Sequence, residues 1–233
     1  MTIVHISGFG CICSLGNNIE QISKNLYTQD SSPSFPTERL ESSFAGQYPV
    51  FQADKNILSQ KKEGESLSYL FLRKALNEAL QKADLKIDDL KKVRLGVCIG
   101  TSVDASFNCF DFYKSWRLGE NKDLKPLDKT LSYSISNQVL IDFNLKGYFQ
   151  TITTACASST DALGIASQWI ENDICDIAIA GGADELNLIP YTGFIKLMIV
   201  SKEPCKPFDK NRNGINLGEG AGIFILESKK SIE

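Results

Sequence analysis

Histidine is nearly absent from this chain of 233 residues, which contains only His5. A metal centre built from several histidines is therefore excluded. A catalytic nucleophile would have no imidazole other than that of His5 to act as its base. His5 falls within a predicted first strand, residues 2–7, where we expect a packed or surface side chain rather than a catalytic one.

A charge excess of either sign is also missing. The 25 basic and 28 acidic residues give a formal net charge of −3 without a basic stripe, so nucleic acid is not an expected partner. No segment reaches 18 uninterrupted apolar residues, and the N-terminus has no basic start before an apolar core. Neither a membrane span nor a signal peptide is predicted, and we expect a cytoplasmic protein.

No CxxC pair occurs among the seven cysteines, whose odd number suits reduced thiols better than a disulfide framework. Cys11 and Cys13 are expected to alternate along a strand and point to opposite faces, which suits neither a disulfide nor a zinc site. No metal site is predicted. Six cysteines are expected to be buried packing residues: Cys11, Cys13, Cys98, Cys109, Cys175 and Cys205.

Strand and helix patterns alternate along the rest of the chain, which predicts an α/β fold with a mainly parallel sheet flanked by helices. Apolar runs predict strands over residues 2–7, 94–99, 147–153, 174–180 and the end of 214–226. Helices are predicted from Asn17 to about residue 27, over 67–80 and over 157–171. Residues 30–64 are polar, contain prolines and form the predicted variable region of a single domain, 1–233.

Cys156 is the most informative residue because it lies at a predicted strand-to-helix turn. The unpaired N–H groups and partial positive charge of a helix N-terminus favour a thiolate there. Small neighbours would let a substrate carbonyl approach, and the backbone N–H of Cys156 could supply half of an oxyanion hole. The alternative is that a turn of small residues serves close packing alone.

Several motifs resemble the β-ketoacyl synthases, the condensing enzymes of fatty-acid and polyketide assembly. The run TTACASSTDALGIASQWIENDICDIAIAGGADE, residues 153–185, resembles their active-site segment. Lys206-Pro207-Phe208-Asp209, followed by Gly218-Glu219-Gly220, matches the next signature. IVHISGFGCICSLGNN, RLGVCIGTS and residues 223–227 also fit, so that only residues 30–64 lie outside the resemblance.

The resemblance implies a thiolase-like fold, of which this chain holds the N-terminal βαβαβαββ half. In the family, the counterpart of Cys156 accepts an acyl group from the phosphopantetheine arm of an acyl carrier protein, and no other cofactor is implied. The histidines, the lysine and the glycine-phenylalanine loop that complete the chemistry come from the second half, which we expect this chain to lack. Seven residues are predicted to be structural rather than chemical turn residues, with Gly181 and Gly182 serving close packing: Gly181, Gly182, Phe208, Asp209, Gly218, Glu219 and Gly220.

The resemblance also implies a partner chain. Family members dimerise through the strand before the active cysteine, which here holds Tyr148, Phe149 and Ile152. We therefore expect a chain-length-factor-like, non-catalytic subunit that pairs with a full-length β-ketoacyl-ACP synthase, as in aryl polyene or polyketide pathways. The retained Cys156 departs from that pattern, since chain-length factors commonly replace the nucleophile. Alternatives are a fragment or half-subunit of an active synthase and a stand-alone Cys156 acyltransferase.

The aromatic segment 101–116 is a candidate for the pocket-shaping role, because its family counterpart reaches towards the acyl pocket at the dimer interface. We expect one or more of its side chains to form the floor of the partner's acyl tunnel and so to limit the length of the acyl chain. Phe107→Ala or Phe110→Ala would then give longer acyl products. The alternative is an amphipathic helix that packs its aromatics inward. The segment contains Phe107, Cys109, Phe110, Phe112, Tyr113 and Trp116.

Overall fold

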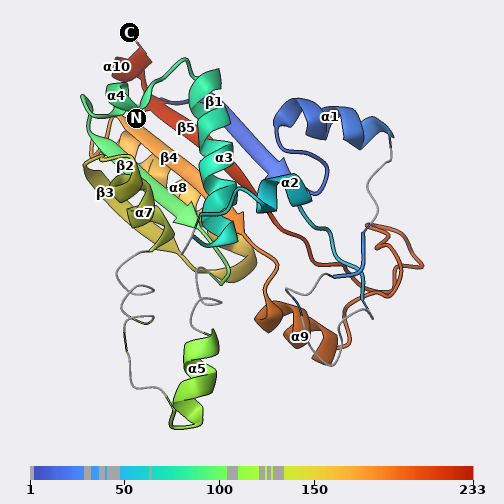
Figure 1. Cartoon of the computed structure of the whole chain (residues 1–233). Coiled ribbons are helices and arrows are strands. Elements are labelled where there is room, and N and C mark those ends of the chain that lie inside the picture. The colour runs from blue at the N-terminus through green and yellow to red at the C-terminus, as the bar shows by residue number, and fades with distance from the viewer. Residues whose placement is uncertain are drawn as a thin grey trace.

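A five-stranded sheet in the order β1-β5-β4-β2-β3 forms the centre of the computed structural model (Figure 1). The structure describes residues 3–28, 33–36, 40, 48–62, 65–103, 110–120, 124, 127 and 134–232. β2 pairs in parallel with both β3 and β4, whereas β5 runs antiparallel to β4 and to β1. This mixed, mainly parallel sheet confirms the predicted fold class. The strands are β1 (Val4–Cys13), β2 (Leu95–Gly100), β3 (Gly147–Ile152), β4 (Ile177–Asp184) and β5 (Gly220–Ser228).

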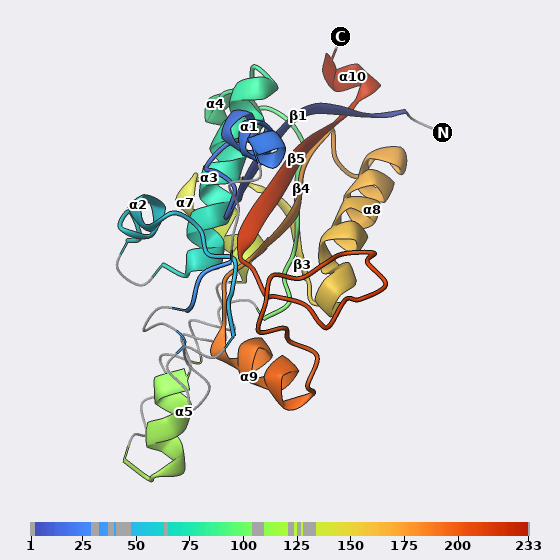
Figure 2. The same cartoon turned by 90° about the vertical axis from the view of Figure 1, so that its right-hand side faces the viewer.

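Helices cover both faces of the sheet (Figure 2). α3, α4 and α7 lie on one face, α8 lies on the other, and α5 extends away from the sheet in both views. The longer helices are α1 (Ile19–Thr28), α3 (Leu67–Lys82), α5 (Phe110–Arg117), α7 (Ile135–Asp142), α8 (Ser158–Glu171) and α9 (Leu188–Lys196). The short ones are α2 (Lys55–Leu58), α4 (Ile87–Leu90), α10 (Lys229–Ile232) and the 3₁₀ turn η3 (Ala155–Ala157). No described helix is long and apolar enough to cross a membrane.

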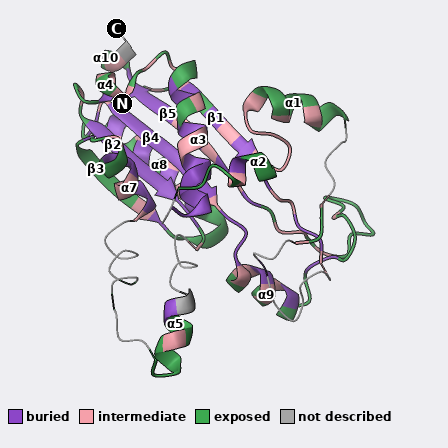
Figure 3. Cartoon of the chain, in the orientation of Figure 1, coloured by how far each residue is buried: buried purple, intermediate pink, exposed green. Residues whose placement is uncertain are grey.

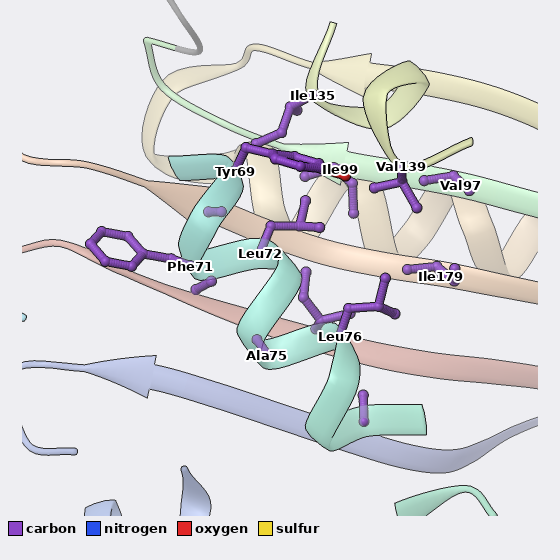
Figure 4. Packing of buried hydrophobic residues seen from close by; sticks show 14 of the residues in the cluster. Tyr69, Phe71, Leu72, Ala75, Leu76, Val97, Ile99, Ile135, Val139 and Ile179 are labelled. Atoms are coloured by element: carbon purple, nitrogen blue, oxygen red, sulfur yellow. The ribbon is translucent and has the colours of Figure 1, made fainter. Parts of the chain in front are cut away.

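The larger core lies between α3 and the sheet (Figure 4). α3 begins at Ser66, whose hydroxyl accepts a hydrogen bond from the N–H of Tyr69 at 3.1 Å, as an N-cap does. The apolar stripe predicted for residues 67–80 is buried, which confirms this helix. Its side chains meet those of β2, β4 and α7, including Leu72, Leu76, Val97, Ile99, Val139 and Ile179.

The second core, under α8, is built from small side chains. Ala162, Ala166 and Ile170 of the helix pack on Cys98 of β2 and on Ala178 and Ala180 of β4, among others. Small residues at both surfaces bring the helix axis close to the sheet, which places the N-terminus of α8 directly over the strand ends.

Two predicted boundaries are wrong because glycines lie inside strands rather than after them. β1 continues through Gly8 and Gly10 to Cys13, and a Cβ at Gly8 would meet the carbonyl oxygen of Ala79 at 2.1 Å. β4 likewise runs through Gly181 and Gly182 instead of ending before them. In both strands glycine permits close packing against a neighbouring helix or strand, so these residues are not chain-reversal signals.

The prediction that Cys11 and Cys13 point to opposite faces is also wrong. Residues two apart in a regular strand share a face, and Cys11 and Cys13 both line one shallow depression that Ser159 also borders. Both are half-buried, as is Cys205, whereas Cys98 and Cys175 are buried as expected. Cys109 lies outside the described residues.

Glu185 ties the end of β4 to the start of α3. Its carboxylate accepts hydrogen bonds from the N–H groups of Leu67 at 2.7 Å and Ser68 at 3.2 Å, while its own N–H donates to the Ser68 hydroxyl at 3.0 Å. Burial nevertheless raises the pKa of Glu185, because the loss of hydration outweighs these bonds.

We expect Glu185→Ala to lower the free energy of unfolding by about 2 kcal/mol, because the buried N–H groups of Leu67 and Ser68 would lose their hydrogen-bond acceptor. Glu185→Gln is the control because it keeps an acceptor oxygen. A pKa raised on folding contributes stability that is present below the unfolded pKa and is lost as pH rises through the folded one. The advantage of wild type over Glu185→Gln in urea unfolding should therefore shrink from pH 4 to pH 7. An advantage that grows with pH would contradict this assignment.

Candidate functional site

Cys156 lies where β3 gives way to α8, in the 3₁₀ turn Ala155–Ala157, and its side chain is exposed. Ala155 has a φ of 53°, a left-handed conformation that is uncommon for a non-glycine residue. Such strain is maintained only where the surroundings fix it, and it occurs often at functional sites. The predicted strand-to-helix turn around Cys156 is therefore present and sharply bent.

Two side-chain hydrogen bonds hold this turn. The hydroxyl of Ser158, which is 2% exposed, donates to the carbonyl of Ala155 at 2.7 Å. The hydroxyl of Thr154 donates to the carboxylate of Asp161, seven residues further along the chain, at 2.5 Å. Asp161 lies in the first turn of α8, where its negative charge interacts favourably with the helix dipole. Cys156 is thus bracketed by bonds that leave its thiol exposed.

The N-terminus of α8 has no side-chain cap, since the N-cap position is held by Ala157. Backbone N–H groups of a first helical turn that receive no side-chain cap can face a bound anion or a developing oxyanion. The absence of a cap at this end therefore suits the predicted oxyanion role better than a helix start bearing its own acceptor would.

Two strand glycines bring the sheet against this helix start. A Cβ at Gly100 would meet the carbonyl carbon and oxygen of Ser158 at 2.3 Å, and one at Gly182 would meet Oγ of Ser159 at 1.9 Å. Gly100 ends β2 and Gly182 lies beside it in β4. Both glycines are required for α8 to start where it does, and Gly100 was missed by sequence reasoning as a positioning residue.

A polar cluster joins the carboxyl ends of β2 and β4. Asp184 accepts hydrogen bonds from the Thr101 hydroxyl at 2.8 Å and from the N–H and hydroxyl of Ser102 at 2.8 and 2.9 Å. In α/β sheets, ligands bind outside the carboxyl ends of the parallel strands. The Cys156 turn and Asp184 are both at this end, although the sequence alone did not mark Asp184.

His5 lies at the other end of the sheet. It is paired with Glu227 of β5, and Glu227 is paired with Ile177 at the start of β4. Cys156 instead follows the carboxyl end of the neighbouring parallel strand β3. His5 therefore cannot serve as the base for this cysteine, in line with its predicted non-catalytic role.

The predicted interface strand is an edge strand with an exposed outer surface (Figure 3). Tyr148 is 60% exposed and Phe149 48%, whereas Ile152 is buried under α8. Of the three predicted interface residues, Tyr148 and Phe149 are thus exposed at the edge of the sheet, whereas Ile152 lies in the core under α8.

The aromatic segment after β2 is only partly described. Phe107 and Cys109 lie outside the described residues, and Phe110 begins α5, but its side chain is not described. Phe112 is buried, whereas Tyr113 and Trp116 are about half exposed and stack with ring centroids 6.3 Å apart. Among the aromatic side chains described in this segment, inward packing of the helix accounts for Phe112 but not for Tyr113 or Trp116.

The predicted turn residues near the C-terminus have distinct roles. Phe208 is fully exposed with a φ of 63°, and Asp209 accepts a hydrogen bond from the N–H of Asn211 at 2.7 Å. Glu219 is buried and accepts bonds from the N–H groups of Ala53 and Leu186 at 2.9 and 3.1 Å, which is a structural arrangement.

The glycines of that turn set and of β4 lie in strands or in an isolated β-bridge. Gly218 forms a bridge with Phe51, and Gly220 begins β5. Gly220, Gly181 and Gly182 lie in strands, so their assignment to turns is corrected.

The family model for the beta-ketoacyl synthase N-terminal domain matches residues 1–231. The chain belongs to the beta-ketoacyl synthase family. The 3-oxoacyl-[acyl-carrier-protein] synthase 1 of Haemophilus influenzae is 26% identical over 239 residues, covering 95% of this chain and 58% of the relative. Synthase 2 of Staphylococcus aureus strain N315 is 27% identical over 244 residues, covering 99% and 58%.

Two solved structures of this family share the fold. The ishigamide ketosynthase/chain length factor superposes with a TM-score of 0.84 at 26% identity, covering 99% of this chain and 59% of that one. A ketosynthase in complex with its chain length factor from Xenorhabdus doucetiae gives 0.76 at 25%, covering 98% and 58%. This beta-ketoacyl synthase chain therefore spans rather more than half the length of these relatives, and its thiolase-like fold corresponds to their N-terminal half.

Proposed function

We propose that this chain is a chain-length-factor-like subunit that pairs through β3 with a full-length β-ketoacyl-ACP synthase and shapes its acyl pocket. The observation that carries the proposal is the exposed edge strand β3, which presents Tyr148 and Phe149 and leads directly into the Cys156 turn. Pairing there would bring a second chain close to the site.

The two edges of the sheet differ in how they resist pairing. β3 has the sequence GYFQTI, with no charge, no proline and an unbroken parallel register with β2. β1, at the other edge, has a register shift between Ile6 and Gly8. Bulges, charges and prolines are the usual means of blocking an exposed edge, and β3 has none of them. An unprotected apolar edge favours β3 as the pairing strand.

The class of partner is supported by the family. The structures from Xenorhabdus doucetiae and of the ishigamide system are, by name, ketosynthases with chain length factors. A β-ketoacyl-ACP synthase is therefore the partner to test first, with an acyl carrier protein as the donor of the acyl chain. No cofactor of the chain's own is proposed.

Co-expression tests this pairing directly. The chain should co-purify with a full-length synthase encoded beside it and give a 1:1 complex by native mass spectrometry. A chain that remains monomeric with the synthase in excess would contradict the proposal.

The shaping role is proposed for the exposed stack of Tyr113 and Trp116 on α5. Bulky rings that reach a partner's tunnel would limit the acyl chain, so Tyr113→Ala/Trp116→Ala should shift the products of the reconstituted pair to longer chains. Arg117→Ala, on the same helix, is the control and should leave the product distribution unchanged. Products of the same length from the double variant would show that this stack does not reach the pocket.

A second candidate function rests on Cys156 itself. Its exposed thiol at an uncapped helix start suits acyl transfer, as in a synthase whose remaining catalytic groups come from further protein. Acyl carrier thioester is incubated with the complex, and the chain is examined by mass for an adduct that Cys156→Ala abolishes. An adduct formed at the rate of product formation would favour this synthase function over the shaping role.

A further inference from the structure

Asp184 holds the point at which the chain leaves β2 for the aromatic segment. One oxygen of its carboxylate accepts hydrogen bonds from the Thr101 hydroxyl and from the N–H of Ser102, both at 2.8 Å. The other oxygen accepts a hydrogen bond from the Ser102 hydroxyl at 2.9 Å. Hydrogen bonds to an ionised carboxylate are stronger than those between neutral groups. A single side chain therefore fixes the two residues that follow β2.

The strand register explains why Asp184 reaches these residues. β2 and β4 pair in parallel, and their last pair is Gly100 with Gly182. Ser102 and Asp184 each lie two residues beyond that pair, so the carboxylate continues the contact between the two strands where the backbone ladder has ended. Asp184 itself is still paired with Gly220 of β5. The carboxylate is thus carried by a strand, which is a rigid support.

The same point of the chain is also tied to β3. The N–H of Thr101 donates to the carbonyl of Ile152, the last residue of β3, at 2.9 Å. Thr101 is fully buried, whereas Ser102 is exposed. The chain therefore leaves the core between these two residues, and the bonds from Ser102 to Asp184 set the direction in which it leaves.

The ends of β2 and β4 also support the start of α8. Gly100 lies against Ser158 and Gly182 against Ser159, the residues that open the helix. The hydrogen bonds at the start of the aromatic segment lie two residues further along each strand. The same pair of strands therefore fixes the Cys156 turn and the start of the aromatic segment relative to each other.

α5 carries the exposed aromatic rings of this segment. The helix begins at Phe110, a short way along the chain from Ser102, and extends away from the sheet (Figure 1, Figure 2). Tyr113 and Trp116 are about half exposed and stack on each other. Because the helix stands away from the sheet, a change of direction at Ser102 would displace both rings.

We propose that Asp184 is a positioning residue for product length. Its hydrogen bonds to Thr101 and Ser102 direct the aromatic segment so that Tyr113 and Trp116 meet the end of the acyl chain in the partner's pocket. This inference rests on the shaping role proposed above for these two rings. Asp184 does not touch the substrate and acts only through α5, so loss of its carboxylate frees the segment and lets longer acyl chains enter.

The test is the product distribution of the reconstituted pair with Asp184→Ala. The ratio of longer to normal products should rise about tenfold, as expected when a hydrogen bond to a charged group is lost. Asp184→Asn should restore the wild-type distribution. Its amide oxygen can accept from the Thr101 hydroxyl and the N–H of Ser102, while its NH₂ group donates to the Ser102 hydroxyl. Asp88→Ala is the control because it removes an exposed carboxylate that pairs with Lys91, and it should leave the products unchanged.

The Tyr113→Ala/Trp116→Ala variant separates this inference from the shaping role. In that background Asp184→Ala should add no further shift, since the rings that it positions are gone. A shift that adds in full would overturn the inference, as would unchanged products from Asp184→Ala beside longer products from the double variant. Unchanged products from the double variant would overturn the shaping role and the inference with it.

A second variant keeps the test decisive if Asp184→Ala does not fold. Thr101→Val/Ser102→Ala removes both hydroxyl donors and leaves Asp184 and the N–H of Ser102 in place. It should shift the products in the same direction as Asp184→Ala, by a smaller factor. Products of wild-type length from this folded variant would overturn the inference.

Discussion

Gly100→Ala is expected to lower the free energy of unfolding by about 3 kcal/mol, because the added methyl group would overlap the backbone of Ser158. α8 has to retreat from the end of β2, and the Cys156 turn moves with it. For a domain of this size, the thermal midpoint should fall by about 6 to 12 °C in calorimetry.

Gly164→Ala is the matched control within α8. A Cβ at Gly164 would meet nothing within 4 Å, and alanine is the better helix former by about 1 kcal/mol. This variant should therefore melt at the same temperature as wild type or slightly higher. Equal destabilisation by the two substitutions would show that glycine loss in general, rather than contact with α8, is responsible.

Tyr148→Lys/Phe149→Lys is expected to weaken pairing with a full-length synthase by at least about 100-fold, or about 2.7 kcal/mol. The double variant removes two exposed aromatic rings and places two positive charges on the edge strand, which opposes strand addition. Because both side chains are exposed, the chain itself should remain folded. Dissociation constants measured by interferometry would give the change.

The control puts the same charges on another exposed pair. Leu26 and Tyr27 lie near the end of α1 and are 61% and 88% exposed, so Leu26→Lys/Tyr27→Lys also adds two positive charges to exposed apolar positions. It should bind the synthase like wild type. Equal loss in both double variants would point to a nonspecific effect of charge.

The elements that the sequence predicted well are those with strong periodic patterns. α3 has a continuous apolar stripe and a serine N-cap, and its predicted start at Leu67 is the observed one. β3 and α8 differ from their predicted ranges by one residue at one end. These patterns arise from burial of one face, which composition and spacing record directly.

The errors come from glycine and from elements without a clear period. Gly8, Gly181 and Gly182 were placed after the ends of their strands, although close packing was correctly expected for Gly181 and Gly182. Each lies inside a strand and allows a close contact that depends on the packing of a distant element. α9 contains Pro190 and Gly193 and was not predicted, nor was α7. Contacts made only in three dimensions leave no periodic trace in the sequence.

The candidate site shows the same division. The position of Cys156 between a strand and a helix was predicted from local pattern and is confirmed. Its supports come from other strands, since Gly100 lies under Ser158 and Asp184 binds residues after β2. The shared face of Cys11 and Cys13, by contrast, follows directly from strand geometry, because side chains two residues apart lie on the same face. The prediction placed them on opposite faces and was therefore wrong.

Hydrogen exchange on β3 tests the central claim most directly. Amide exchange in the peptide covering Gly147–Ile152 would be followed by mass spectrometry with and without a full-length synthase in excess. Pairing through this edge predicts slower exchange in that peptide on addition of the synthase, with no change in α1. A complex that forms while exchange in β3 stays the same would contradict the proposed pairing strand.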